Sequence, residues 1–356
     1  MVTTWLRTAA IALLITACTD GATTEQAEEV TAGSASSSDV VTLSDTASAP
    51  SVPFEEAAGD SIFLRYKPGQ VLTYRTTQTA EDIQDTLSSL SNTAHVYTKK
   101  IRGIRGDGAF DIEITYNQIK STGTLKNTKT GAIIRSETFD SKDSAKLRDP
   151  RNAQFSALLG EPVTVILTPQ AKIQEISGVS SIVNKMISKL PKNDSIQLPP
   201  QAREEITRQV QTIMYASVIG QELIPYPEGG LVSSMTWEHS QTAPVSPLYT
   251  ISTTAKYRIV SIKRIKGRRI ATVTATFSGK VIATPPPPQF GATLKLNSSN
   301  ITGDGTAIVD LESGATISKK NKVSISLSAT VTEKATGKVT KINNTSNKRF
   351  DVELLP

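Results

Sequence analysis

The residue with the clearest chemistry is Cys18, the only cysteine of the 356-residue sequence. It follows Ile-Thr-Ala at 15–17 and a short apolar run at 9–14, which one basic residue, Arg7, precedes. A basic start, a short apolar centre and small residues before a cleavage point are the three regions of a secretory signal. The run is too short to cross a bilayer, which takes about 20 apolar residues. We therefore predict that residues 1–17 are removed and that Cys18 becomes the first residue.

The stretch Ile-Thr-Ala-Cys at 15–18 resembles the lipobox of bacterial lipoproteins. The resemblance implies that the sulfur of Cys18 receives a diacylglycerol and that the new amino terminus is acylated. Two or more acyl chains anchor a protein stably, whereas one chain binds only marginally. The alternative is cleavage after Ala17 that leaves an unmodified thiol. In the enteric sorting rule, aspartate directly after the cysteine retains a lipoprotein in the inner membrane. Here Thr19 holds that position, so we expect the outer membrane, with the body facing the periplasm.

Composition separates an acidic leader from a basic body. Nine acidic residues and no Lys or Arg lie between Cys18 and Asp60, although the whole chain has a net charge of +6. Segment 18–60 is rich in Ser, Thr, Ala and Glu, so it buries too little apolar surface to offset its ordering entropy, and we predict a disordered tether. No later stretch has the 18 uninterrupted apolar residues of a membrane span. A basic body suits anionic envelope surfaces, although a solvated, Lys-rich surface is the simpler explanation.

Alternation of apolar and polar residues predicts a mainly β (α+β) body. Residues 110–116 alternate behind an Asp-Gly turn, which is typical of a half-buried antiparallel strand, and the same period returns at 323–332 and 350–354. A shift of 161 residues superposes positions of like hydrophobic class, such as Ile101 and Ile262, and the segments 169–173 and 313–317 are also similar. We therefore predict two related antiparallel β units, 61–178 and 224–356.

Between these units the hydrophobic period changes to that of a helix. Apolar residues recur three or four positions apart from Val179 to Leu190, and again between Pro200 and Val218. We predict a two-helix connector over 179–223 whose apolar stripes pack across the sheets. The residues that we expect to face a ligand there are Val179, Ile182, Val183, Met186, Ile187, Ile206, Val210, Ile213 and Met214.

The body resembles a family of bacterial lipoproteins catalogued as a domain of unknown function, number 6263. The matching features are Leu-Arg-Tyr-Lys-Pro-Gly at 64–69 with Tyr74, the strand at 109–116, the segment 159–173, the helices, and the region of Trp237. Family members usually place glycine and an acidic residue just before that tryptophan, where this chain has Ser-Met-Thr. The resemblance covers nearly the whole body and implies no activity, because none is established for the family.

Motifs for catalysis or metal binding are missing from the sequence. The two histidines, His95 and His239, lack the spacing of metal ligands, and no Gly-x-Ser-x-Gly elbow is present. The Gly-Asp-Gly at 303–305 lacks the lysine and the length of a phosphate loop. We therefore expect no enzyme activity, no metal, no cofactor and no nucleic-acid partner, with an envelope hydrolase kept as a third alternative.

These observations favour a non-catalytic cell-envelope lipoprotein that binds a hydrophobic or envelope-derived ligand between the sheets and the helices. The alternative is a structural or interaction lipoprotein, whose basic surface docks on a protein partner, peptidoglycan or lipopolysaccharide. Whether the two β units share one core is open at this point, and so is the oligomeric state.

Overall fold

The computed structural model describes residues 41, 46, 51–52, 62–189, 200–227, 236–246, 249–284 and 291–356. The predicted signal at 1–17 and Cys18 lie outside these ranges. The strands are β1 (Ser51–Val52), β2 (Val71–Gln84), β3 (Leu87–Ile104), β4 (Phe110–Asn127), β5 (Ile133–Asp140), β6 (Pro162–Leu167), β7 (Ile173–Ser177), β8 (Thr236–Ser246), β9 (Tyr249–Ile265), β10 (Arg268–Ala283), β11 (Ala292–Asp310), β12 (Thr316–Glu333) and β13 (Val339–Leu355). The helical elements are α2 (Ser144–Arg148), η3 (Pro150–Asn152), α3 (Ala153–Ser156), α4 (Ser180–Ser188), α5 (Pro200–Gln209), η4 (Val210–Ala216) and α6 (Ser217–Glu222).

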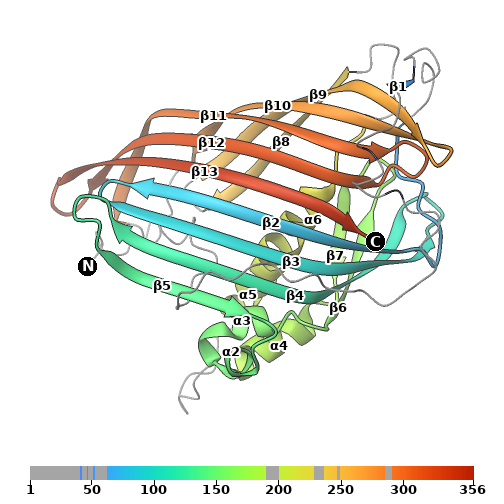
Figure 1. Ribbon diagram of the computed structural model, residues 1–356. Helices are drawn as coiled ribbons and strands as arrows, with labels where there is room; N and C mark the ends of the chain where they lie inside the picture. Colours follow the sequence, from blue (N-terminus) through green and yellow to red (C-terminus); the bar gives the residue numbers. More distant parts are fainter. Residues whose placement is uncertain are drawn as a thin grey trace.

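All of these strands belong to one 13-stranded sheet, so the predicted mainly β class is confirmed (Figure 1). The order is β1-β9-β10-β11-β12-β13-β2-β3-β4-β6-β7, with β5 paired to β4 and β8 paired to β9, and every pairing is antiparallel. The alternation predicted for 110–116 is present, because Phe110, Ile112, Ile114 and Tyr116 are buried. The longest strands have 18 or 19 residues, which corresponds to about 60 Å at ~3.3 Å per residue.

The two predicted β units are continuous with each other. Strand β13 pairs with β12 on one side and with β2 on the other, where Leu354 lies opposite Tyr74. Ladder hydrogen bonds therefore join the strands of 61–178 to those of 224–356. One buried cluster includes residues of both stretches, from Ile62 to Leu354, so the two stretches share a core.

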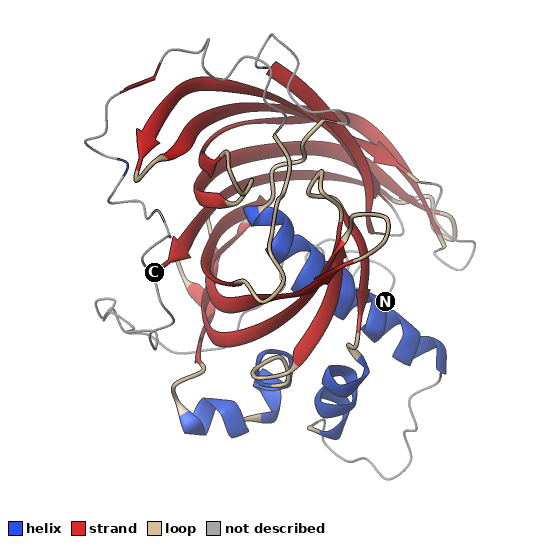
Figure 2. Ribbon diagram, turned by 90° about the vertical axis from the view of Figure 1, so that its right-hand side faces the viewer, coloured by secondary structure: helices blue, strands red, loops and turns tan. Residues whose placement is uncertain are grey.

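The sheet curls into a trough, and glycines on its concave face permit the curvature (Figure 2). Strong curvature crowds the side chains of a concave face. A Cβ at Gly303 would lie 2.3 Å from the backbone oxygen of Lys322, and one at Gly279 would lie 2.3 Å from that of Ser252. Because any other residue would push the strands apart, these glycines act as bending points.

One long helix enters the concave side of this trough, and the helices do not join two separate sheets (Figure 2). The first predicted helix corresponds to α4. The second corresponds to α5, η4 and α6, which follow one another without a break from 200 to 222. This continuous helix runs into the space that the strands enclose (Figure 2), where α6 contacts β12, β13 and β2. The short elements α2 and α3, which the hydrophobic period does not predict, lie beside β5 and α4 (Figure 1).

Segment 62–66 closes one end of the trough by bridging two hairpin turns. The amide of Leu64 donates to the carbonyl of Pro169 at 2.7 Å, and the amide of Arg65 donates to that of Ser313 at 2.8 Å. Tyr226 contacts the same turns through Gln170 and Gly314. These turns belong to the segments 169–173 and 313–317, which the sequence comparison within the chain relates to each other. The structure thus brings the two similar turns to one end of the sheet.

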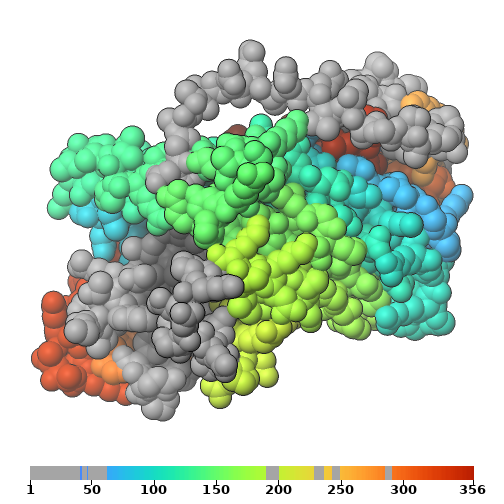
Figure 3. Space-filling model, turned by 90° about the horizontal axis from the view of Figure 1, so that it is seen from below, coloured from blue at the N-terminus to red at the C-terminus, as the bar shows by residue number. Residues whose placement is uncertain are grey.

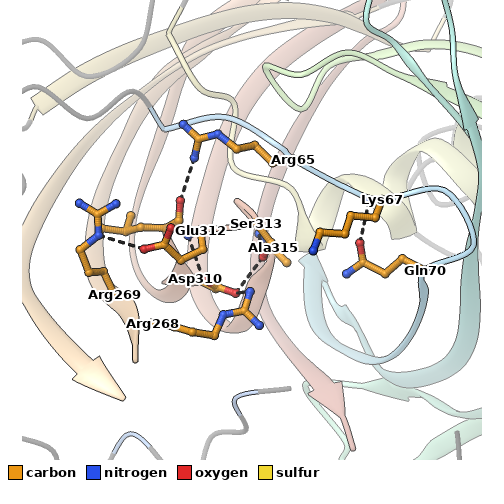
Figure 4. A network of polar contacts seen from close by, with 10 residues as sticks. Arg65, Lys67, Gln70, Arg268, Arg269, Asp310, Glu312, Ser313 and Ala315 are labelled. Atoms are coloured by element: carbon orange, nitrogen blue, oxygen red, sulfur yellow. Dashed lines mark hydrogen bonds and ion pairs between the residues drawn. The ribbon is translucent and has the colours of Figure 1, made fainter. Parts of the chain in front are cut away.

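A polar network stabilises this closed end (Figure 4). The guanidinium of Arg65 donates to the carbonyl oxygen of Leu311 at 3.1 Å, Arg268 forms an ion pair with Asp310, and Arg269 contacts Glu312 at 3.0 Å. Gly314 has φ +71°, and its Cα faces the backbone of residue 63 so closely that a Cβ would lie 2.4 Å from the carbonyl oxygen. Only glycine fits there.

The segment predicted as a tether contributes to the fold near its C-terminal end. Ser51 and Val52 form the short strand β1 against β9, Val41 is buried, and Lys263 donates to the backbone oxygen of Thr46 at 3.0 Å. Composition alone missed these contacts, because an exposed edge of β9 supplies the hydrogen bonds that the segment cannot make by itself. Contacts with the rest of the fold therefore begin before residue 60, where composition places the end of the tether.

Candidate ligand cavity

A cavity of about 890 Å³ lies between the concave face of the sheet and the helix formed by α5, η4 and α6. Residues 212–221 form its helical wall, and inward side chains of β2, β3, β8, β9, β10, β12 and β13 form the opposite wall. Figure 3 shows the outer side of this helical layer, where the yellow-green helical residues lie beside the green residues of the β4 and β5 region. Ligand pockets in proteins typically measure about 300–1,000 Å³, so this volume is large enough for a ligand.

The lining combines apolar side chains with neutral or cationic polar ones. Its large apolar contributions include Phe277 and Phe350 from the sheet and Ile213 and Met214 from the helix. Its basic residues are Lys172, Lys319, Lys348, His95 and His239, and no Asp or Glu is among the described residues that line it. The cavity therefore offers apolar walls together with positive charge.

The ligand-facing residues predicted from the sequence divide into two groups. Ile213, with an exposed fraction of 37%, and Met214, which also packs against the core, line the cavity. Val179, Ile182, Val183 and Val210 are fully buried in the core, and Met186, Ile187 and Ile206 pack against it. The apolar stripe of α4 thus lies against other side chains of the core, and the cavity wall comes from η4 and α6.

Sequence reasoning missed the sheet side of this cavity. Lys348 has the same parity in β13 as Phe350 and Val352, so the alternation already placed it on the inner face. It was overlooked because a charged residue on a half-buried strand is usually assigned to the wet face. Lys319 has the corresponding position in β12, opposite Val352.

The helical wall includes a π-helical stretch, η4, at Val210–Ala216. Two hydrogen bonds join this stretch to neighbouring strands, one of them through a backbone oxygen that the widened turn leaves available. The hydroxyl of Tyr116 donates to the backbone oxygen of Met214, and the side-chain amide of Gln211 donates to the backbone oxygen of Ile176 at 2.8 Å. Tyr116 belongs to a row of buried rings, in which its centroid lies 5.9 Å from that of Tyr97 and 5.2 Å from that of Tyr215. Aromatic packing and hydrogen bonds thus fix this wall.

A buried ion pair fixes the C-terminal end of the helix. Glu222 in α6 pairs with Lys99 in β3, and the exposed fractions of the two side chains are 1% and 0%. The hydroxyl of Tyr97 donates to the same carboxylate, and the Lys99 ammonium lies 5.1 Å and 5.2 Å from the ring centroids of Tyr66 and Tyr74. Burial lowers the pKa of Lys99 to about 7, and the Glu222 carboxylate acts against that shift because it stabilises the ammonium.

The free carbonyl groups at the helix end also find partners on β12. Thr316 donates to the backbone oxygen of Glu222 at 2.6 Å, and Lys319 donates to that of Leu223 at 2.6 Å. A cation at the C-terminal end of a helix also interacts favourably with the helix dipole. Burial lowers the pKa of Lys319 to about 8. The ammonium of Lys319 is therefore engaged at the C-terminal end of the helix, although the residue also lines the cavity.

Both histidines line the cavity, and both have lowered pKa values. Burial lowers the pKa of His95 to about 4, and its ring lies 5.4 Å from that of Tyr116. Burial and, to a smaller extent, the charge of Lys172 also lower the pKa of His239. Both imidazoles are therefore neutral at pH 7. No group of three or more His, Cys, Asp or Glu in the described part of the chain is arranged to hold a metal ion.

Cys18, the predicted lipidation site, lies outside the described residues. Among the helices that the structure describes, none combines the length and the apolar character that crossing a membrane requires.

Comparisons with solved structures give weak similarity only. Pseudomonas aeruginosa OccK7 (OpdD) is 7% identical, with 81% of this chain and 100% of that chain covered and a TM-score of 0.22. The COG4313 outer membrane channel from Pseudomonas putida F1 is 9% identical, with 83% and 98% covered and a TM-score of 0.16. A DUF1329 family protein from Desulfovibrio piger is 7% identical, with 79% and 85% covered and a TM-score of 0.13. At such TM-scores these likenesses support no conclusion about this chain.

Comparison at the level of sequence families is more informative. No curated protein matches the sequence. The family model described as "Family of unknown function (DUF6263)" matches residues 107–316, which is more than half of the chain and extends from the turn before β4 to the start of β12. The chain therefore belongs to the DUF6263 family.

Proposed function

We propose that this protein is a non-catalytic cell-envelope lipoprotein that binds a hydrophobic or envelope-derived ligand inside its curled sheet. The observation that carries the proposal is the cavity of about 890 Å³ between the sheet and the helix. A filled core would place Ile213 against other side chains, whereas it remains 37% exposed on the cavity wall. The lipid anchor at Cys18 is supported by the lipobox alone.

The apolar part of the cavity suits an acyl chain or a similar group. Burial of apolar surface contributes about 25 cal/mol per Å², so a chain that covers Ile213, Met214, Phe277 and Phe350 gains several kcal/mol. The enclosing helix is fixed at Glu222 and at the π-helical stretch, so the cavity is largely preformed. A preformed site reduces the entropy cost of binding.

The test is native mass spectrometry of the purified full chain with Cys18→Ser. This variant lacks the predicted lipid anchor, so it can be purified without detergent. We expect a retained amphiphile, and a rise in melting temperature when acyl ligands are added. A ligand at 100 times its Kd stabilises the folded state by about 2.7 kcal/mol. Absence of both a retained ligand and a lipid-dependent shift refutes the proposal. Salt-sensitive retention on cell-wall fractions would then favour the structural or interaction role.

A cavity-filling variant tests the location of the site. Ala216 lines the cavity from η4, so Ala216→Phe should abolish ligand retention because its ring fills the space next to Met214. The control is Ala145→Phe, which makes the same change at an exposed helical position in α2. Equal ligand retention by both variants would show that the ligand binds elsewhere.

A further inference from the structure

We infer that the ligand of this cavity is an amphiphile with an anionic head group, and that Lys348 binds the head group. The inference rests on the proposed function, since it names the class of ligand for the same cavity. It starts from charge: the described lining has three lysines and no carboxylate. The positive charge of this lining attracts an anionic ligand and repels a cationic one.

Lys348 is the lysine best placed to bind such a group. Lys319 already donates to the backbone oxygen of Leu223, so its ammonium is engaged at the helix end. Lys348 lies in the middle of β13, between Val323 of β12 and Ala80 of β2. Its side-chain ammonium has no hydrogen bond or ion pair with the described residues, and it lines the cavity. Its interaction with Asp82 of β2 is electrostatic only: burial raises the pKa of Asp82, and the charge of Lys348 is a smaller effect in the opposite direction.

Amide side chains surround the next inward position of β13. Phe350 lies opposite Asn321 on one side and Gln78 on the other, and all three line the cavity. From the helix, Gln221 donates through Nε2 to Oε1 of Gln78 at 3.2 Å, which leaves the side-chain NH₂ of Gln78 for another acceptor. Carboxylate and phosphate oxygens accept from ammonium and amide donors, and such charge-assisted hydrogen bonds are about twice as strong as neutral ones.

A buried polar atom nearby also points to a ligand. Oε1 of Gln221 is inaccessible to solvent and has no hydrogen-bond donor among the described residues. A buried acceptor without a donor is uncommon in proteins and usually indicates a missing partner. A hydroxyl group of a glycerol-type head group can donate to this oxygen once the Gln221 amide turns towards the cavity that it lines.

The apolar chain of the ligand would extend along the sheet from Lys348 towards β10. A Cβ at Gly303 would lie 3.2 Å from Cδ2 of Phe277, so the Phe277 ring lies over the strand that glycine leaves uncovered. Val323 separates this ring from Lys348 at the same level of the sheet. A cation and an apolar surface thus lie at one level of the sheet with β11 and β12 between them, as the head group and the extended chain of an acidic amphiphile require.

The experiment compares ligands that share one oleoyl or oleyl chain and differ in head group. Equilibrium binding to the full chain with Cys18→Ser is to be measured for oleate, oleoyl lysophosphatidate, monoolein and oleylamine. Each ligand is kept below its critical micelle concentration. We expect one or both anionic ligands to bind at least tenfold more tightly than monoolein, with oleylamine weakest. Preference for the carboxylate or for the phosphate then distinguishes a fatty acid from a phospholipid as the source.

Variants of Lys348 connect this preference to the site. Lys348→Gln should weaken binding of the anionic ligand about tenfold or more, and should change the affinity for monoolein by less than about twofold. Lys348→Arg keeps the charge, so it should retain most of the preference for the anionic ligand. The control is Lys341→Gln, at an exposed position on the opposite face of the same strand.

Two outcomes separate the inference from the proposed function. Equal binding of oleate, lysophosphatidate and monoolein, or an anion preference that Lys348→Gln leaves intact, overturns the inference while the cavity still binds an amphiphile. Failure of all four ligands to bind overturns both.

Discussion

The buried pair of Lys99 and Glu222 should be among the interactions on which stability depends most, and it can be tested by a double-mutant cycle. The two side chains have exposed fractions of 0% and 1%, so solvent does not screen either charge. Lys99→Met removes the cation and keeps most of the apolar stem. Glu222→Gln removes the anion and keeps an acceptor for the hydroxyl of Tyr97. The double variant leaves no buried charge at the site.

Burial determines the magnitude. Removal of one partner of a buried ion pair leaves an uncompensated charge, and such changes cost about 3–5 kcal/mol. Replacement of both partners removes the desolvation penalty as well, so we expect the double variant to lose no more than about 2 kcal/mol. The two single losses should therefore exceed the double loss by several kcal/mol. This difference is the coupling energy of the pair.

The assay is urea unfolding at pH 7 followed by circular dichroism, with hydrogen exchange of residues 210–222 as a local readout. Glu222 ends the helical wall, so the single variants should also accelerate exchange there. The matched control is the pair Arg208 and Glu205 on the surface of α5, whose exposed fractions are 69% and 45%. Arg208→Met and Glu205→Gln should each cost less than about 1 kcal/mol. Additive losses at Lys99 and Glu222, with a coupling below about 0.5 kcal/mol, would refute the reasoning.

Three further predictions concern curvature, pH and the anchor. Gly303→Ala should destabilise the fold by more than about 2 kcal/mol, because the added Cβ would meet the backbone oxygen of Lys322. The control Gly103→Ala should cost less than about 1 kcal/mol, because no atom lies within 4 Å of the added Cβ. Similar urea midpoints for the two variants would contradict the role of Gly303 in curvature. Burial lowers the pKa of His95 from 6.5 to about 4, so the unfolded chain binds a proton that the folded chain does not, and stability should fall as the pH falls from 6.5 to 4. His95→Gln should flatten that part of the profile of unfolding free energy against pH, and an unchanged slope would show that His95 is not responsible. Intact mass of membrane-extracted protein should show a triacylated Cys18, and Cys18→Ser should move the protein to the soluble fraction; a free thiol at Cys18 in the membrane-extracted wild type would exclude the anchor.

Hydrophobic period predicted the secondary structure well. The strand at 110–116 and the helices on either side of residue 190 are local patterns, and the structure contains β4, α4 and α5 at these places. Pairing between β13 and β2 could not be predicted in the same way, because it joins segments from opposite ends of the body. The π-helical stretch could not be predicted either, because its hydrogen bonds join it to distant strands: Tyr116 of β4 donates to the backbone oxygen of Met214, and Gln211 donates to that of Ile176 in β7.

The candidate site was predicted on the helix and missed on the sheet. Ile213 and Met214 carry an apolar signal that indicates a buried or ligand-facing position. Lys348 carries the opposite signal, and only the parity of β13 relates it to the inner face. Lys99 and Glu222 gave no signal at all, because the value of an ion pair depends on two charges being buried together.

The sequence alone determined the β class, the helical period between the β stretches, the family resemblance and the candidate lipidation of Cys18. These follow from neighbouring residues, because backbone preference and side-chain alternation are local properties of the chain. Tertiary structure decided that one sheet curls around a helix, that glycines at 279 and 303 allow the bend, and that lysines line the enclosed space. These features arise from contacts between distant segments, whose free energy depends on burial that no single segment produces by itself.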